Sequence, residues 1–284
     1  MKHESGLNNP TLLTTSKMNN NNYLNRIRNS AFWALDTTRG GEIRKDLIDI
    51  EDSFSLNSFE ALKKKNEEAL QALLENTVNN SKFYNNLKGY KTLDDFPVMN
   101  KHIVKSNLDS LLVRNSKNGK LHTIYTSGST GTPFTIKQTQ RKRKRNTADT
   151  LFFANRAGYT LGDKLLYVRL WNKTLKKGKI PSFLQNIEQI DVEELETENI
   201  NHLLKKLQKD KSPKGWLGYP SALEKICDYL DKIESKPIEC NVKSIIGMSE
   251  NLPRHVRSRM WYYFNTPMVS RYSNFENGII AQQD

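Results

Sequence analysis

The chain has 284 residues, with 44 Lys and Arg against 31 Asp and Glu, and its net charge is +13. Apolar residues make up 36% of it, a low share for a globular protein but more than a disordered chain carries. No stretch reaches the ~20 apolar residues that cross a bilayer. With only two cysteines, Cys227 and Cys240, a disulfide framework is excluded. We therefore expect a soluble, cytoplasmic protein, and the basic excess makes nucleic acid a partner to be tested against the motifs.

The first part of the chain is predicted to be helical after a polar start. Residues 1–22 are rich in asparagine and show no apolar period, which predicts a disordered tail. A short docking helix is expected over Tyr23–Leu35. Ser58 is placed to cap a further helix, whose apolar stripe consists of Phe59, Leu62, Leu70, Leu73, Leu74 and Val78. With another short helix near Asn100, residues 23–120 form a predicted helical N-terminal region.

The second part of the chain alternates strands and helices. The patterns predict strands at 121–125, 134–137, 165–170, 242–247 and 268–272. They predict helices at 143–157, 199–207, 221–233 and 253–264, with Ser221 as a candidate cap. Such alternation is typical of a mostly parallel sheet flanked by helices. We expect residues 121–284 to form one α/β core.

A loop between the first two of these strands carries the strongest chemical signal. It reads Thr126-Ser-Gly-Ser-Thr-Gly-Thr-Pro133. Its glycines allow successive amide groups to point at one anion, and its hydroxyls add neutral donors, as a polyphosphate site needs. The loop is not a Walker A motif, because Thr132 and Pro133 follow Gly131, and it lacks the G-x-G-x-x-G spacing of dinucleotide-binding folds. A hairpin without a ligand is the structural alternative.

Thr126–Pro133 resembles the phosphate-binding signature of the adenylate-forming superfamily, which includes acyl-CoA synthetases, peptide-synthetase adenylation domains and luciferases. Two further segments follow in the order of that family. Gly247–Glu250 is similar to the turn that lies along the adenine, and Tyr272–Glu276 to the segment whose aromatic ring stacks on the adenine. The continuation Asn277–Ala281 resembles the phenylacetate–CoA ligase branch and its relatives in capsular polysaccharide gene clusters.

The resemblance implies ATP-dependent activation of a carboxylic acid as an acyl-adenylate, with Mg²⁺, followed in many members by transfer to coenzyme A. It implies phosphate contacts from Thr126, Ser127, Gly128, Ser129, Thr130, Gly131 and Thr132. It also implies adenine contacts from Ser249, Glu250, Tyr272 and Ser273, and a magnesium ligand at Glu276. A carboxylate with phosphate oxygens suits such a hard cation. Strand-end packing for Tyr272 and a surface charge for Glu276 are the alternatives.

At some positions the residue type differs from the family pattern, and at others the family pattern assigns a less specific role. Ser273 stands where glycine is usual and Phe275 where a hydroxyl contacts the phosphate, which puts the contact at position 275 in doubt. Tyr219 lies in a turn that the family places near the acyl pocket, and a plain turn before a helix is its alternative. No base is required, because a carboxylate is already nucleophilic at pH 7. The five histidines show no metal-ligand spacing.

The resemblance spans about residues 58–284, so the expected fold is an incomplete N-terminal domain of the adenylate-forming ligase fold. The family's ribose-binding Asp and the lid domain with its catalytic Lys lie downstream of Glu276, and the sequence contains eight residues after it. No catalytic residue is therefore assigned. We expect this chain alone to be impaired as a ligase. An uncovered sheet edge favours an oligomer or a partner that supplies the missing half.

The basic run Arg141–Arg145 supports a competing hypothesis, a catalytically silent protein that binds nucleic acid or another partner. The run has no interleaved aromatic residues and belongs to no nucleic-acid-binding motif. A solvated helix start is the simpler interpretation, so we expect nucleic acid not to be a partner.

Overall fold

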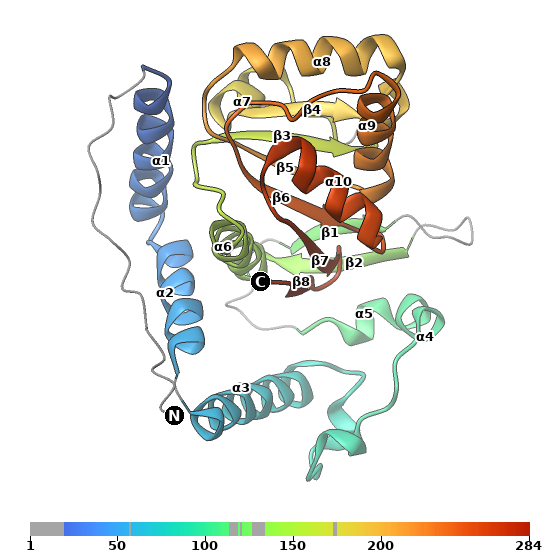
Figure 1. Ribbon diagram of the computed structural model, residues 1–284. Helices are drawn as coiled ribbons and strands as arrows, with labels where there is room; N and C mark the ends of the chain where they lie inside the picture. The colour runs from blue at the N-terminus through green and yellow to red at the C-terminus, as the bar shows by residue number, and fades with distance from the viewer. Residues whose placement is uncertain (1–19, 57, 114–118, 120, 127–133, 173–174) are drawn as a thin grey trace, which may run out of the picture.

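The computed structural model describes residues 20–56, 58–113, 119, 121–126, 134–172 and 175–284 (Figure 1). Its helices are α1 (Asn20–Thr38), α2 (Glu42–Ser55), α3 (Phe59–Asn80), α4 (Lys101–Ser106), α5 (Leu108–Leu111), α6 (Gln140–Arg156), α7 (Lys179–Leu184), α8 (Thr197–Lys209), α9 (Pro220–Lys232) and α10 (Arg254–Phe264). Its strands are β1 (Leu121–Thr126), β2 (Phe134–Thr139), β3 (Lys164–Arg169), β4 (Ile187–Asp191), β5 (Lys214–Gly218), β6 (Val242–Met248), β7 (Met268–Asn274) and β8 (Gly278–Gln282). None of the helices described has the length and apolar character that a membrane crossing requires.

Six of these strands form one sheet in the order β4-β3-β5-β6-β7-β8. The strands from β4 to β7 are parallel to their neighbours, and only β8 runs antiparallel, against β7. Strands β1 and β2 pair separately as an antiparallel hairpin. This arrangement confirms the mostly parallel sheet flanked by helices that the sequence predicts. It also fixes where the carboxyl ends of β3, β5, β6 and β7 lie, along one edge of the sheet.

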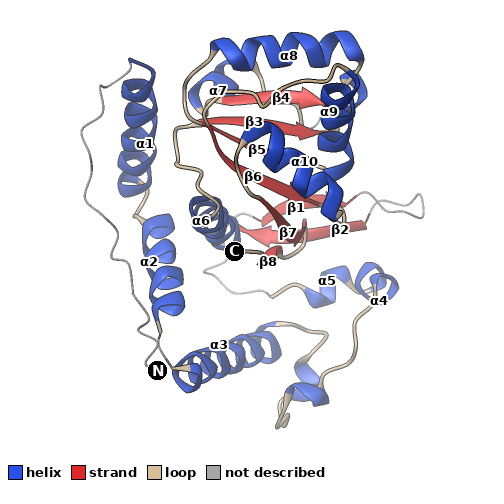
Figure 2. Ribbon diagram, in the orientation of Figure 1, coloured by secondary structure: helices blue, strands red, loops and turns tan. Residues whose placement is uncertain are grey.

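Helices cover both faces of the sheet (Figure 2). On one face, α8, α9 and α10 bury the larger apolar cluster, in which Leu203, Leu223 and Met260 pack against Trp216 and Ile245 of the strands. On the other face, α6 contributes a smaller cluster formed by Ala154, Leu217, Ile246, Met248 and Val269. Because successive residues of a strand point to opposite faces, β5, β6 and β7 supply alternate side chains to the two clusters.

Two N-terminal helices attach to this core through specific contacts. Helix α1 packs so closely on Gly162 that a Cβ there would lie 2.2 Å from the backbone oxygen of Asn25. The Asn25 amide donates to the buried Asp163 carboxylate at 3.0 Å. Helix α2 lies against α6, where Ile50 packs on Phe152. The attachment therefore combines close backbone packing, a buried polar contact and an apolar contact.

Most predicted elements are confirmed, with shifts of a few residues at their ends. The Ser58 cap is present, since its side chain accepts from the Ala61 amide. The predicted stripe of that helix is only partly buried, because Phe59 and Leu73 remain 76% and 60% exposed. Ser221 does not cap α9; Pro220 begins that helix, and Ser221 contacts a distant carboxylate instead. Helix α2 and strands β4, β5 and β8 were not predicted.

Strand β5 escapes sequence analysis because it begins with a lysine and contains two glycines, yet it is buried along its whole length. The Lys214 side chain is fully buried. Its ammonium group donates to the backbone carbonyls of Asp210, Ser212 and Cys240. Three acceptors for three N–H donors explain how a lysine is tolerated inside the sheet.

Candidate active site

The register of the sheet brings several predicted site residues to one edge. Gly218 of β5 lies opposite Gly247 of β6, and Met248 lies opposite Arg271 of β7. Tyr219, the Ser249–Glu250 turn and Tyr272 follow directly at the carboxyl ends of these strands. In open α/β sheets, ligands bind in the crevice outside this edge. The structure thus brings together three segments that lie apart in the chain, between Tyr219 and Tyr272, as the predicted site requires.

Small residues let the backbone segments of this edge approach one another. A Cβ on Gly218 would lie 2.8 Å from the Val168 side chain, and one on Gly247 would lie 2.8 Å from Met268. After β6 the chain turns sharply, with Ser249 in the left-handed region at φ 66°. This turn is the one predicted to lie along an adenine.

The Glu250 side chain fixes that turn to the start of α9. Its two carboxylate oxygens accept from the backbone amide and the hydroxyl of Ser221, each at 3.0 Å. A carboxylate at the first turn of a helix satisfies an orphan amide and interacts favourably with the helix dipole. Glu250 therefore has a structural contact of its own, and only its backbone remains free to contact a ligand in the way predicted.

Glu276 lies in the tight turn between β7 and β8. Strand β2 and helix α6 hold this turn: the buried Gln138 amide donates to the carbonyls of Phe275 and Glu276 at 3.0 and 3.2 Å. The Lys142 ammonium donates to the Asn277 carbonyl at 2.9 Å. The Glu276 carboxylate itself is half-buried and makes no ion pair or hydrogen bond within the described ranges. A positioned, unpaired carboxylate is what a cation ligand needs.

The hydroxyl-rich loop can be placed only by its two flanking strands. Thr126 ends β1 and pairs in register with Phe134, the first residue of β2. Ser127–Pro133, which contain all the other predicted phosphate contacts, lie outside the described residues. The strand that leaves this loop is also the one that supplies Gln138 to the Glu276 turn. The predicted phosphate loop and the predicted magnesium ligand are thus attached to the same strand.

Of the two aromatic side chains predicted near a ligand, Tyr272 is exposed and Tyr219 is half-buried. Tyr219 packs against the edges of both apolar clusters. Tyr272 is 66% exposed, which leaves its ring accessible to a stacking partner. Ser273, on the following position of β7, is half-buried. The pairing of β7 with β8 changes register between these two consecutive residues.

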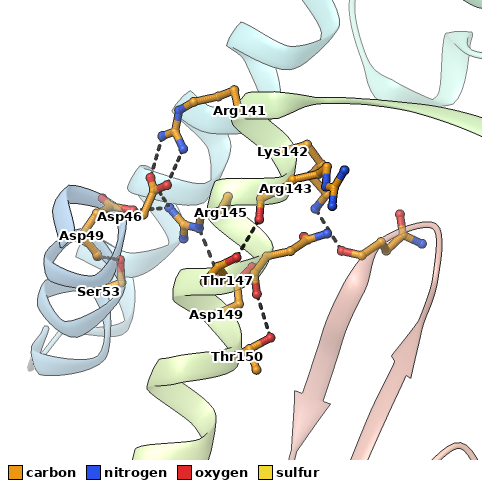
Figure 3. A network of polar contacts seen from close by, with 12 residues as sticks. Asp46, Asp49, Ser53, Arg141, Lys142, Arg143, Arg145, Thr147, Asp149 and Thr150 are labelled. Atoms are coloured by element: carbon orange, nitrogen blue, oxygen red, sulfur yellow. Dashed lines mark hydrogen bonds and ion pairs between the residues drawn. The ribbon is translucent and has the colours of Figure 1, made fainter. Parts of the chain in front are cut away.

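The basic run at the start of α6 is engaged within the chain (Figure 3). Arg141 forms a two-pronged ion pair with the buried Asp46 carboxylate of α2. Arg145 pairs with Asp49 at 2.8 Å, and the remaining members contact their neighbours as follows: Lys142 with Asn277, Arg143 with His122, and Lys144 with Glu42. The run is therefore a docking surface for α2, a role that its sequence did not suggest.

Sequence analysis also missed the groups that hold the site in place. Gln138 and Lys142 carry no recognisable motif, and their importance depends on contacts more than 130 residues away in sequence. Arg271, just before Tyr272, is another: it is buried at 6% exposure. Its position in a strand was predicted, but the face to which it points was not.

A groove of about 720 Å³ lies at the opposite, amino edge of the sheet, between α1 and α8. Arg28, Lys164 and Lys209 are among its lining residues, and none of the predicted site residues takes part. Across the described ranges there is also no group of three or more side chains suited to hold a metal ion. A cation at Glu276 would therefore depend on ligand oxygens for the rest of its coordination.

Solved structures of 2-hydroxyisobutyryl-CoA ligase share this fold. An open conformation in complex with 2-HIB-AMP and CoA has a TM-score of 0.58 at 14% identity, over 78% of this chain and 56% of the ligase. The complex in the thioesterification state has a TM-score of 0.59 at 15% identity, over 78% and 51%. A post-adenylation complex with R3-HIB-AMP has a TM-score of 0.56 at 13% identity, over 78% and 50%.

The chain thus spans about half the length of the solved ligases it matches. No protein-family model matches the sequence, and comparison with curated proteins also found no match. Likeness at this level of identity concerns the fold. The chain therefore shares the fold of part of 2-hydroxyisobutyryl-CoA ligase.

Proposed function

We propose that this chain binds ATP with Mg²⁺ and belongs to an enzyme that activates a carboxylic acid as its acyl-adenylate. The observation that carries the proposal is the sheet register, which gathers Tyr219, the Ser249–Glu250 turn and Tyr272 at one edge beside the Glu276 turn. These three segments resemble ligase segments in sequence, and they lie together in a fold that is similar to that of a solved ligase. Chance resemblance of a single loop would not give this coincidence.

The reaction is an in-line displacement at the α-phosphorus of ATP. A carboxylate oxygen of the acid forms a bond to that phosphorus, and the bond to the pyrophosphate oxygen breaks, with pyrophosphate as the leaving group. Positioning and charge neutralisation therefore supply most of the catalysis. In this chain the loop from Thr126 to Thr132 would hold the leaving pyrophosphate, while the exposed Tyr272 ring would stack on the adenine.

Glu276 is the residue that would hold the magnesium ion. Its carboxylate makes no ion pair within the described residues, since the nearby Lys142 ammonium binds the Asn277 carbonyl, and it suits a hard, oxygen-seeking ion. When bound, magnesium offsets the charge that develops on the departing phosphate oxygens. Gln138 and Lys142 would keep the turn in place by binding its backbone carbonyls, which leaves the Glu276 side chain free.

Finer assignments are part of the same proposal. The Asn277–Ala281 continuation supports the phenylacetate–CoA ligase branch and its capsule-associated relatives. In a second step, the thiol sulfur of coenzyme A would bond to the acyl carbon while the bond from that carbon to the phosphate oxygen breaks and AMP leaves. The CoA present in the solved ligase complexes supports this step. We also propose the division into an N-terminal tail, a helical region and a nucleotide-binding core (121–284), with a cytoplasmic location. The predicted tail boundary at residue 22 shifts, because α1 begins at Asn20, and residues 1–19 lie outside the described residues.

Titration with ATP and Mg²⁺ is the experiment that tests the proposal. We expect saturable binding that is weakened at least tenfold by Ser129→Ala, Gly131→Ala and Glu276→Gln. Ser235→Ala, on an exposed turn whose hydroxyl contacts only the neighbouring Lys236 carbonyl, is the matched control and should bind normally. Absence of nucleotide binding, or equal binding by all variants, would refute the proposal.

Pyrophosphate exchange with a panel of carboxylates then asks whether the chain also carries out the chemistry. Exchange dependent on one class of acid would extend the proposal from binding to activation. Salt-dependent retention on oligonucleotides, without ATP binding, would favour the competing hypothesis of a basic binding protein. The pairing of the 141–145 run with α2 reduces the charge available for that role.

A further inference from the structure

Among the described residues, Arg271 is a buried cation without a partner of opposite charge. It lies on β7 with 6% of its surface exposed. Its Nε donates to the Gln282 side chain of β8 at 2.9 Å. Its Nη2 is buried and makes no hydrogen bond, so both N–H donors of that nitrogen are unused within the described structure.

The other buried charged side chains in the described ranges are all compensated. They are Asp36, Asp46, Asp163 and Lys214. Asp46 forms an ion pair with Arg141, and Lys214 donates to three backbone carbonyls. Asp36 accepts hydrogen bonds from two backbone amides. Asp163 accepts from the Asn25 side-chain amide and from one backbone amide. Arg271 is the exception among them. Since an uncompensated buried charge is unfavourable, its persistence calls for a function.

The Tyr167 phenol lies near Arg271, and within the described residues no carboxylate forms an ion pair with this guanidinium. Burial lowers the pKa of its guanidinium to about 10, and only the nearby Tyr167 phenol opposes this effect. Arg169 contacts the same phenol, with its Nη1 3.4 Å from the Tyr167 oxygen. Arg169 also lacks an ion pair within the described ranges, and its guanidinium lies 5.5 Å from the centre of the Trp171 ring. The Tyr167 phenol thus accepts from Arg169 and lies close enough to Arg271 to influence its charge.

This cluster lies on the α6 face of the sheet, close to its carboxyl edge. Arg271 is opposite Met248, a member of the smaller apolar cluster, and two residues after Val269, another member. Residues two apart on a strand share a face, so Arg271 points to that cluster and the exposed Tyr272 points away from it. Strand β7 therefore presents the candidate adenine contact and the buried cation on opposite faces at consecutive positions.

We propose that Arg271 determines acid specificity, and that the activated acid carries a second carboxylate which binds to Arg271. The inference rests on the proposed function and names the substrate class of that site. A planar guanidinium binds a carboxylate through two parallel hydrogen bonds, which would satisfy the unused donors. The reacting carboxylate would remain at the strand ends, and the second would extend along the sheet face.

A purely structural role would give Arg271 a different environment. A guanidinium that stabilises a fold is paired with a carboxylate or surrounded by carbonyls, as Arg141 and Lys214 are here. Removal of such a group leaves a buried partner unsatisfied and destabilises the protein. Removal of Arg271 would leave only the Gln282 oxygen without its donor. We therefore expect its loss to affect ligand choice more than stability.

Arg271→Met, which keeps the length of the side chain and removes the charge, is the test variant. Arg271→Lys keeps the positive charge but removes the planar guanidinium that can donate two parallel hydrogen bonds. Arg254→Met, at an exposed arginine of α10, is the matched control. Calorimetric titration with malonate, succinate, glutarate and adipate is compared with titration by propionate, butyrate, valerate and caproate. The thermal midpoint and the affinity for ATP with Mg²⁺ are recorded for each variant.

We expect the wild-type chain to bind at least one dicarboxylate at least tenfold more tightly than the matched monocarboxylate. Arg271→Met should abolish this preference without lowering the thermal midpoint or weakening ATP binding, and Arg271→Lys should retain part of it. A preference that survives in Arg271→Met, or the absence of any dicarboxylate preference in the wild type, would overturn the inference. A fall in thermal midpoint with unchanged acid binding would show a structural role.

The nucleotide measurement separates this inference from the proposed function. Loss of ATP binding in the wild type refutes the proposed function, whereas dicarboxylate binding that depends on Arg271 is measured without nucleotide and is judged independently. If acids bind and pyrophosphate exchange occurs, the same preference should appear in the exchange rates. Exchange that is equally fast with monocarboxylates would contradict the assignment of Arg271.

Discussion

The side-chain amide of Gln138 lies 3.2 Å from the backbone oxygen of Glu276 and donates to it, although the two residues are 138 positions apart. The same nitrogen donates to the Phe275 carbonyl at 3.0 Å. We predict that Gln138→Leu weakens binding of ATP in the presence of Mg²⁺ about tenfold, which corresponds to about 1.4 kcal/mol. The reason is that the turn would no longer hold Glu276 in one position. Calorimetric titration with and without Mg²⁺ measures this effect.

Lys137→Met is the control for Gln138→Leu. Lys137 is the preceding residue of β2, so its side chain points to the opposite side of the strand, where it contacts the Thr123 hydroxyl. It should bind nucleotide normally. An equal loss for Gln138→Leu with and without Mg²⁺ would show that Gln138 acts through general stability and not through the Glu276 turn.

Asp46 joins α2 to α6, and we predict that Asp46→Asn destabilises the chain by about 2 kcal/mol. The Asp46 side chain is only 4% exposed, whereas the side chains of its partners Arg141 and Arg145 are 58% and 36% exposed. Loss of one member of a fully buried pair costs about 3–5 kcal/mol, and partial solvation of the arginines reduces this figure. Thermal unfolding should show a decrease of about 4–8 °C.

The control for Asp46→Asn is Glu42→Gln, which removes a more exposed carboxylate, paired with Lys144 in the same interface. Its effect should stay below about 1 kcal/mol. Limited proteolysis adds a local measurement, since release of α2 from α6 should expose its backbone to cleavage. Equal stability losses in the two variants would mean that burial of the Asp46 carboxylate is unimportant.

The sequence predicts the parts of this protein that depend on local pattern. Helix α3 follows from its Ser58 cap, and the parallel sheet follows from alternating strands and helices. Strand β5 was missed because Lys214 and two glycines hide a strand whose burial is set by tertiary contacts. No local rule indicates that an ammonium group will find three carbonyls.

In the candidate site, too, some residues follow from short sequence motifs and others only from tertiary contacts. Short motifs predict Ser249, Glu250, Tyr272 and Glu276, and the register places them at neighbouring positions of one edge. The contacts of Gln138 and the isolation of Arg271 arise only when distant strands come together. The basic run at 141–145 shows the limit most clearly, because its partners lie on α2, a helix that the sequence pattern did not predict.

Asp210 predicts how stability responds to acid. Burial alone would raise the pKa of the Asp210 carboxyl, but hydrogen bonds from Lys164 and Ser212 outweigh it and lower the pKa to about 2. A lowered pKa stabilises the folded chain above the unfolded value of 3.8, and this contribution is lost as the pH falls toward 2. Its size is on the order of 1 kcal/mol after allowance for partial solvent exposure.

Denaturant unfolding of the wild type and Asp210→Asn between pH 6 and pH 2 measures this contribution. The difference in stability between the two proteins should be constant above about pH 5 and should shrink steadily below pH 4. Other carboxylates titrate in both proteins and cancel in the difference. A difference that stays constant down to pH 2 would show that Asp210 does not titrate in this range.

Glu250 links the predicted adenine turn to the start of α9, and we predict two effects of Glu250→Ala. Loss of the bonds to the amide and hydroxyl of Ser221 should destabilise the chain by about 1 kcal/mol, as loss of a helix cap does. Affinity for ATP should also fall, because the Ser249–Glu250 backbone would no longer be fixed beside Gly247.

Ser221→Ala, which removes only the hydroxyl, separates the two effects. This variant should lose part of the stability. Its ATP affinity should stay close to that of the wild type, because Glu250 still accepts from the backbone amide of residue 221. A normal ATP affinity in Glu250→Ala would mean that this turn does not contact the nucleotide.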